Sequence, residues 1–130
     1  MSSIFTKIIN GEIPCHKVYE DDKTIVFMDI LPVQPGMVLV VPKAEIDNFE
    51  ELSEEDYQAL WATVKKVAKK MRQGLPVKKK IAVQVEGLDV AHAHVKMFPF
   101  DTGAEFHARP NTALQPDHAA LAEMAKKLAF

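Results

Sequence analysis

The residues best suited to chemistry in this chain lie between His92 and Lys96, where polar and apolar side chains alternate. A period of two is typical of a β-strand, whose successive side chains point to opposite faces. We therefore predict a strand over Ala91–Phe98 whose apolar residues face a core and whose other face carries His92, His94 and Lys96. Two imidazoles and an ammonium in one row, about 6–7 Å apart, are well suited to holding a phosphate.

Two other interpretations of this row stay open on the residues alone. The polar side chains can form the solvent-facing side of an antiparallel sheet. Alternatively, His92 and His94 can bind a transition metal with a third ligand from His107 or His118. Because no carboxylate cluster lies nearby and the Lys96 ammonium repels cations, we predict that no metal binds here.

Length and composition indicate an ordinary globular protein. The chain has 130 residues, so we predict one domain over residues 1–130. A chain of this size buries roughly two-thirds of its unfolded surface. Hydrophobic residues make up 48% and charged residues 26%, which argues against a disordered chain. The formal net charge of −2 argues against general nucleic-acid binding but allows a local site for a small anion.

The single cysteine, Cys15, can form neither an internal disulfide nor a cysteine zinc site by itself. We therefore expect a reducing compartment, the cytoplasm. The first residues lack a basic region followed by a long apolar stretch, so we expect no signal peptide. No apolar run approaches the length of a membrane span, and we expect no membrane partner.

Periodicity and turn residues predict the order of the elements. Ser3 caps a first helix that ends at Gly11, and Ser53 caps the longest one. The predicted helices cover Ile4–Asn10, Ser53–Gly74 and Pro116–Leu128, and an irregular loop covers Asp101–Gln115. The predicted strands cover Lys17–Glu20, Thr24–Ile30, Met37–Val41, Lys80–Glu86 and Ala91–Phe98. These elements predict an α+β fold with about five antiparallel strands and helices against one face.

Three segments, taken in order, resemble the histidine triad (HIT) family of nucleotide hydrolases and transferases. They are residues 4–14 with 17–22, residues 27–32 with 35–43, and the row from His92 to Lys96. The resemblance covers about residues 3–100, and it implies the HIT-like form of the α+β fold.

The resemblance implies a role for each residue of the row. His94 corresponds to the family's nucleophile, which forms a nucleotidyl-histidine intermediate while a backbone carbonyl holds its other N–H group. His92 corresponds to the first histidine, whereas Lys96 replaces the third. The ammonium of Lys96 can stabilise phosphoryl charge and favour a neutral nucleophile. It differs from histidine, which can also donate a proton near neutral pH.

The resemblance also implies a nucleotide site. Asp29 matches the acid that binds the ribose hydroxyls, for which a carboxylate offers two acceptors. The apolar slot for the base matches Phe5, Ile8, Ile13, Phe27 and Ile30. Asp89 stands among the positions that commonly contact phosphate, where it must point away or be neutralised.

Several family positions are changed in this chain. Met37 replaces a further histidine, and Leu88 and Asp89 replace polar phosphate contacts. Ser3 and Thr6 stand where many members carry cysteine zinc ligands, so we predict no structural zinc and no cofactor.

The resulting prediction is a hydrolase or nucleotidyl transferase that binds a purine nucleotide or nucleotide conjugate and reacts through His94. Its expected substrates resemble nucleoside phosphoramidates or dinucleoside polyphosphates. The family implies a homodimer formed through the longest helix and the strand Lys80–Glu86. The alternative is a nucleotide-binding protein with weak or no turnover, because Met37 and Lys96 depart from the family pattern.

Overall fold

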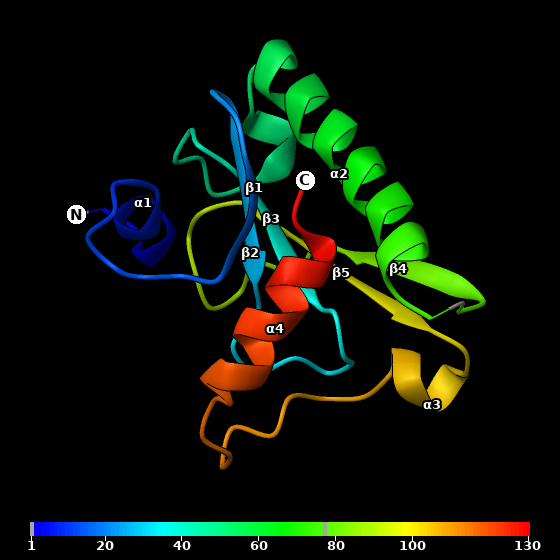
Figure 1. The fold of residues 1–130 in the computed structure, drawn as a ribbon. Helices are drawn as coiled ribbons and strands as arrows, with labels where there is room; N and C mark the ends of the chain where they lie inside the picture. Colours follow the sequence, from blue (N-terminus) through cyan, green and yellow to red (C-terminus); the bar gives the residue numbers. More distant parts are fainter. Residues whose placement is uncertain (1, 77) are drawn as a thin grey trace.

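The computed structural model describes residues 2–76 and 78–130, which form a five-stranded antiparallel sheet with helices on both faces (Figure 1). The strands are β1 (Lys17–Glu20), β2 (Thr24–Met28), β3 (Val38–Pro42), β4 (Lys80–Gln84) and β5 (Val95–Phe100). The helices are α1 (Ile4–Ile9), the 3-10 turn η1 (Phe49–Glu51), α2 (Glu54–Gly74), α3 (Gly103–Phe106) and α4 (His118–Leu128). The predicted α+β class with five antiparallel strands is confirmed. The helices do not all lie against one face as predicted, because α1 packs on the face opposite α2 and α4.

The strands lie in the order β1-β2-β3-β5-β4. Helix α2 therefore connects two strands that are not neighbours, and β5 returns to pair with both β3 and β4. Because β1 and β4 are the edges, the histidine row leads into an inner strand of the sheet.

The alternating side chains of β2 and β3 divide the apolar core into two layers. Val26 and Val40, which pair in register, point toward α2 and α4. Phe27 and Leu39, the next pair, point toward α1. Since both faces are covered, every residue of these two strands is buried, and their sequences are almost continuously apolar.

Helix α2 begins where its sequence predicts. Ser53 accepts a hydrogen bond from Asp56 N at 3.1 Å, and three acidic residues occupy the positive end of the helix. Its buried face consists of Leu60, Thr63, Val64, Val67 and Met71. The exposed face is polar, and no helix in the described ranges is both long and apolar enough to cross a membrane.

Strand β5 is shorter at its start than the predicted Ala91–Phe98. It begins at Val95, because the preceding residues form hydrogen bonds outside the sheet ladder. Ala93 N, for example, donates to Ile46 O at 2.7 Å. The two histidines of the row therefore lie in a bend before the strand.

The segment expected as an irregular loop over Asp101–Gln115 contains one short helix, α3. Thr102 caps it by accepting a hydrogen bond from Glu105 N at 3.2 Å. The cap is local in sequence, but four helical residues are too few to give a clear hydrophobic period.

A substitution at Gly74 tests the contact between α2 and α4. A Cβ at this position lies 2.6 Å from the Lys127 carbonyl oxygen. Alanine favours a helix by about 1 kcal/mol over glycine. We nevertheless expect Gly74→Ala to lower the free energy of unfolding by about 1–3 kcal/mol, because backbone atoms must move apart.

Urea denaturation measures this change, with Gly103→Ala as the matched control. A Cβ at Gly103, the first residue of α3, meets no atom within 4 Å. The free energy of unfolding of Gly103→Ala should equal that of the wild type or be slightly higher. A Gly74→Ala protein as stable as the wild type contradicts the packing described for these helices.

Candidate active site

The ring of His94 is fixed by one hydrogen bond and one aromatic contact. Nδ1 lies 2.9 Å from the carbonyl oxygen of His92, and because a carbonyl only accepts, Nδ1 carries the proton. Phe5 of α1 packs edge-on against the ring, with the centroids 4.8 Å apart. In the neutral imidazole, Nε2 is therefore the unprotonated and nucleophilic atom.

The Nε2 atom of His94 keeps contact with solvent. It forms no hydrogen bond to the described part of the chain. In that part, the only enclosed side-chain nitrogen or oxygen without a partner is Trp61 Nε1. Only 5% of the His94 surface is exposed, so access to the ring is restricted.

The surroundings of His94 lower its pKa below that of an ordinary histidine. Burial is the main cause, because it disfavours the imidazolium, and the Lys96 ammonium and His92 add repulsion. The hydrogen bond to the His92 carbonyl and the Asp29 carboxylate act in the opposite direction. Because the folded-state pKa is lowered, the stability linked to this group declines as the pH falls through the ordinary histidine range. At neutral pH the ring is uncharged.

The prediction that the whole row lies within a strand, on the face away from the core, is wrong for its two histidines, which precede β5 and are buried. His92 has no exposed surface and His94 very little, whereas Lys96 is half-buried on β5. The reason is helix α1, which covers this face and places the Phe5 ring against both imidazoles. Strand periodicity gives the direction of a side chain but not what covers it.

His92 joins α1 to the sheet through a chain of hydrogen bonds. Its Nε2 donates to the Pro42 carbonyl at 2.7 Å, and its Nδ1 lies 2.7 Å from Ser3 Oγ. Ser3 also caps α1 by accepting from Thr6 N at 3.0 Å. Glu45 accepts from Ser3 N and from Thr6 Oγ1, both at 2.6 Å. This network holds Phe5 and the His92 carbonyl in place around the His94 ring.

The histidines are distributed over three places. His118 Nδ1 lies 2.9 Å from His16 Nε2, and His107 lines a cavity described below. Within residues 2–76 and 78–130, no three His, Cys, Asp or Glu side chains are grouped so as to hold a metal ion. His107 and His118 are therefore not grouped with His92 and His94 as ligands of one metal.

A polar cavity of about 420 Å³ adjoins the His94 region. Its wall includes Asp29, Gln84, Glu86, Lys96, His107 and Arg109. Lys96 follows His94 by two residues, and its ammonium and the Asp29 carboxylate both shift the pKa of His94. Cations and carboxylates thus surround a space within the size range of small-molecule sites.

Asp29 directly follows β2 and forms part of the wall of the polar cavity. Its Oδ1 accepts from Leu31 N at 2.9 Å, and its own N–H donates to Met37 O at 3.1 Å. Its Oδ2 makes no hydrogen bond to the described residues, so it remains available as an acceptor. The structure thus brings Asp29, Lys96 and His94 into one region.

The five apolar residues expected to enclose a base do not share one cavity. Phe5 and Phe27 contact each other edge-on within a buried cluster, with centroids 5.7 Å apart. Ile8 and Ile13 line a separate cavity of about 260 Å³. Ile30 is 51% exposed and lines a third cavity. These cavities therefore do not gather all five residues around one space, although Ile8 also packs against the cluster that holds Phe5 and Phe27.

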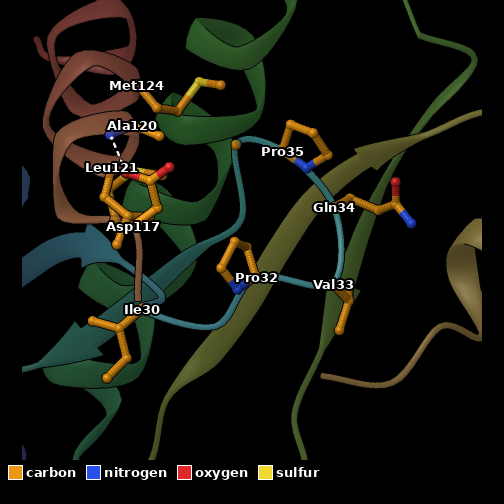
Figure 2. A pocket seen from close by; sticks show the side chains of 11 residues that line it. Ile30, Pro32, Val33, Gln34, Pro35, Asp117, Ala120, Leu121 and Met124 are labelled. Carbon is orange, nitrogen blue, oxygen red and sulfur yellow. Dashed lines mark hydrogen bonds between the residues drawn. The ribbon is translucent and has the colours of Figure 1, made fainter. Parts of the chain in front are cut away.

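The third cavity is apolar, with a volume of about 300 Å³. Figure 2 shows it between the loop that carries Ile30, Pro32 and Pro35 and the first turns of α4. At the start of α4, Asp117 accepts a hydrogen bond from Ala120 N at 3.1 Å. None of the three residues of the histidine row lines this apolar cavity. Of the row, Lys96 lines the polar cavity, and His94 belongs to the wall of neither.

Gln84, Glu86, His107 and Arg109 line the polar cavity although no sequence motif marks them. Gln84 pairs with Lys96 in the register of β4 with β5, Glu86 lies two residues after the end of β4, and the other two follow α3. For His107 and Arg109, the only local signal in the sequence is their His-x-Arg spacing, and it is weak. Asp89, which the resemblance placed near phosphate, is exposed and lies outside the wall of this cavity.

The environment of His94 predicts a specific titration by NMR. We expect the ring nitrogens to report a Nδ1–H tautomer and a pKa below about 6.5, the ordinary histidine value. Lys96→Met should raise this pKa because an ammonium is removed, whereas the exposed control Lys69→Met should leave it unchanged. A Nε2–H tautomer, or a pKa above the ordinary value, contradicts the geometry.

Relatives of known sequence share much of this chain. The HIT domain family profile matches residues 10–103. An uncharacterized HIT-like protein of Methanocaldococcus jannaschii is 36% identical over 100 residues, which cover 74% of this chain and 77% of that protein. The adenosine 5′-monophosphoramidase hnt1 of Schizosaccharomyces pombe is 44% identical over 69 residues, which cover 53% of this chain and 52% of that protein.

Solved structures share the fold. A Hit-like protein of Bartonella henselae, involved in cell-cycle regulation, superposes with a TM-score of 0.82 at 32% identity, covering 98% of this chain and 94% of that one. A hypothetical histidine triad nucleotide-binding protein of Sulfolobus tokodaii has a TM-score of 0.81 at 24% identity, covering 95% and 87%. The matched residues and the shared fold together show that this protein belongs to the HIT domain family.

Proposed function

We propose that this HIT protein is a nucleotide hydrolase or nucleotidyl transferase that forms a nucleotidyl-histidine intermediate on His94. The observation that supports this most directly is the bond from Nδ1 to the His92 carbonyl, which leaves Nε2 unprotonated and in contact with solvent. The phosphoramidase named among the relatives favours nucleoside phosphoramidates as substrates. Dinucleoside polyphosphates, which present the same α-phosphate, form the second substrate class.

The reaction proceeds in two steps. Nε2 of His94 attacks the α-phosphorus, the bond to the leaving group breaks, and its electron pair departs with that group. The ring then carries Nδ1–H and a bond from Nε2 to phosphorus, and the His92 carbonyl stabilises its positive charge. Water or another acceptor then attacks the phosphorus and gives up a proton to solvent. The bond between phosphorus and Nε2 breaks, its electron pair returns to Nε2, and the nucleotide is released.

Asp29 and Lys96 bind the substrate on either side of the phosphorus. The free Oδ2 of Asp29 accepts hydrogen bonds from the ribose hydroxyls, while Oδ1 remains bound to Leu31 N. Lys96 places its ammonium in the polar cavity, where it stabilises the charge on the phosphoryl oxygens.

Mass spectrometry of protein mixed with adenosine 5′-phosphoramidate tests the chemistry. We expect a nucleotidyl adduct on His94 in the wild type and none in His94→Asn, which retains a donor but lacks Nε2. Asp29→Asn should still form the adduct, with KM raised roughly tenfold, because a hydrogen bond to a charged group contributes about 1.5–3 kcal/mol.

His118→Asn is the matched control for removal of a histidine, because His118 is exposed and bonded to His16. We expect His118→Asn to form the nucleotidyl adduct on His94 to the same extent as the wild type. An adduct on any other residue, or none on the wild type with either substrate class, overturns the proposed chemistry.

Two observations favour the second candidate function, a nucleotide-binding protein with weak turnover. His94 is almost completely covered, and Lys96 occupies the third position of the motif. Nucleoside monophosphate binding that depends on Asp29, together with no adduct and no turnover, identifies this alternative.

We also propose that the protein is a homodimer joined through β4. This strand is a sheet edge, and Val83 and Val85 remain 42% and 40% exposed. Val83 pairs with Met97, so it lies on the face of the sheet that α2 covers. A second copy paired along β4 extends the sheet and covers these residues.

Light scattering after size-exclusion chromatography tests the dimer. We expect a dimer for the wild type and a monomer for Val83→Lys, because a charge then lies in the interface. Leu114→Lys, which alters an exposed apolar residue far from β4 in sequence, should remain dimeric. A monomeric wild type at micromolar concentration contradicts this part of the proposal.

A further inference from the structure

We propose that His107 protonates the leaving group, and this inference rests on the proposed function. When the bond to phosphorus breaks, an amine or alkoxide must gain a proton to leave readily. A lysine ammonium ordinarily titrates near pH 10.4, so it is a poor donor at neutral pH, whereas imidazole titrates near 6.5. The motif position that holds Lys96 therefore leaves the proton transfer to another residue.

His107 lines the same cavity as Lys96 and Asp29, although it lies outside the histidine motif. It directly follows α3, where its N–H donates to Gly103 O at 2.9 Å. Its ring packs edge-on against Phe106, with centroids 5.0 Å apart. The imidazole is exposed to solvent, so it can regain a proton after each reaction.

Helix α3 is anchored to the sheet face that carries Lys96. The Phe106 ring lies 5.2 Å from that of Phe100 and 6.2 Å from that of Phe98, measured between centroids. On the other side, Gln34 Nε2 donates to Glu105 O at 3.2 Å, which ties α3 to the loop after Asp29. These contacts hold His107 over the cavity rather than on a free loop.

The charges around the cavity suit a proton donor. Arg109 and Lys96 supply two cations, and Asp29 and Glu86 supply two carboxylates. The carboxylates tolerate an imidazolium among them, while the cations hold the phosphoryl oxygens. As the bond between phosphorus and an amine nitrogen breaks, the nitrogen keeps the electron pair and takes the proton of His107, which becomes neutral. Solvent then returns the proton.

Two substrates with the same adenylyl group separate proton donation from a structural role. One is an adenosine 5′-phosphoramidate with an alkylamine leaving group, which requires protonation. The other is the p-nitrophenyl ester of AMP, whose phenolate leaves without a proton. The value of kcat/KM reports the steps up to leaving-group release for both.

His107→Asn should lower kcat/KM for the alkylamine substrate by about 100-fold and for the ester by less than about twofold. The decline of kcat/KM with the alkylamine at alkaline pH should flatten in this variant. In His107→Ala, added imidazole should restore turnover of the alkylamine substrate. His118→Asn should leave kcat/KM unchanged for both substrates.

Equal losses on both substrates, or no loss on either, overturn the role of His107 while leaving the nucleotidyl-His94 chemistry intact. Failure of the wild type to form the His94 adduct with the ester overturns the proposed function itself. The two failures are therefore distinguishable in the same experiment.

Discussion

The hydrogen bond from His94 Nδ1 to the His92 carbonyl is the constraint on which the rest of the site depends. It determines which nitrogen carries the proton, and it directs the other nitrogen toward solvent. Rotation of the ring would leave a buried N–H without a partner, at a cost of about 1–3 kcal/mol. The bond forms because the chain bends before β5, which brings a backbone carbonyl within reach of a side chain two residues later.

Hydrogen bonds between His92 and the start of α1 help to hold that bend in place. His92 cannot move without losing its bonds to Ser3 and Pro42, and Ser3 is also the cap of α1. The two faces of the sheet therefore differ: α2 and α4 bury the larger apolar cluster, while α1 covers the histidines. In this chain hydrogen bonds that involve Ser3, Thr6 and Glu45 join α1 to the sheet.

His94 and the polar groups around the polar cavity come from separate elements. His94 precedes an inner strand, Asp29 follows β2, and His107 follows α3. Aromatic packing of Phe106 against β5 and the Gln34–Glu105 bond bring the last of these over the sheet. Charged groups of both signs thus meet beside an uncharged imidazole, an arrangement suited to transfer of a negatively charged phosphoryl group.

The sequence alone determined the strands, the caps at Ser3 and Ser53, and the family, because these depend on neighbours within a few residues or on matched segments. Through the resemblance it also grouped Asp29 and Lys96 with His94, and the structure brings these three residues into one region. Only the tertiary structure decided that His92 and His94 are buried and that the apolar residues expected to hold a base are divided among cavities. It also decided that His107 lines the same cavity as Lys96. The physical reason is that alternation fixes the direction of a side chain, whereas burial depends on contacts such as that between Phe5 and His94, which are distant in the chain.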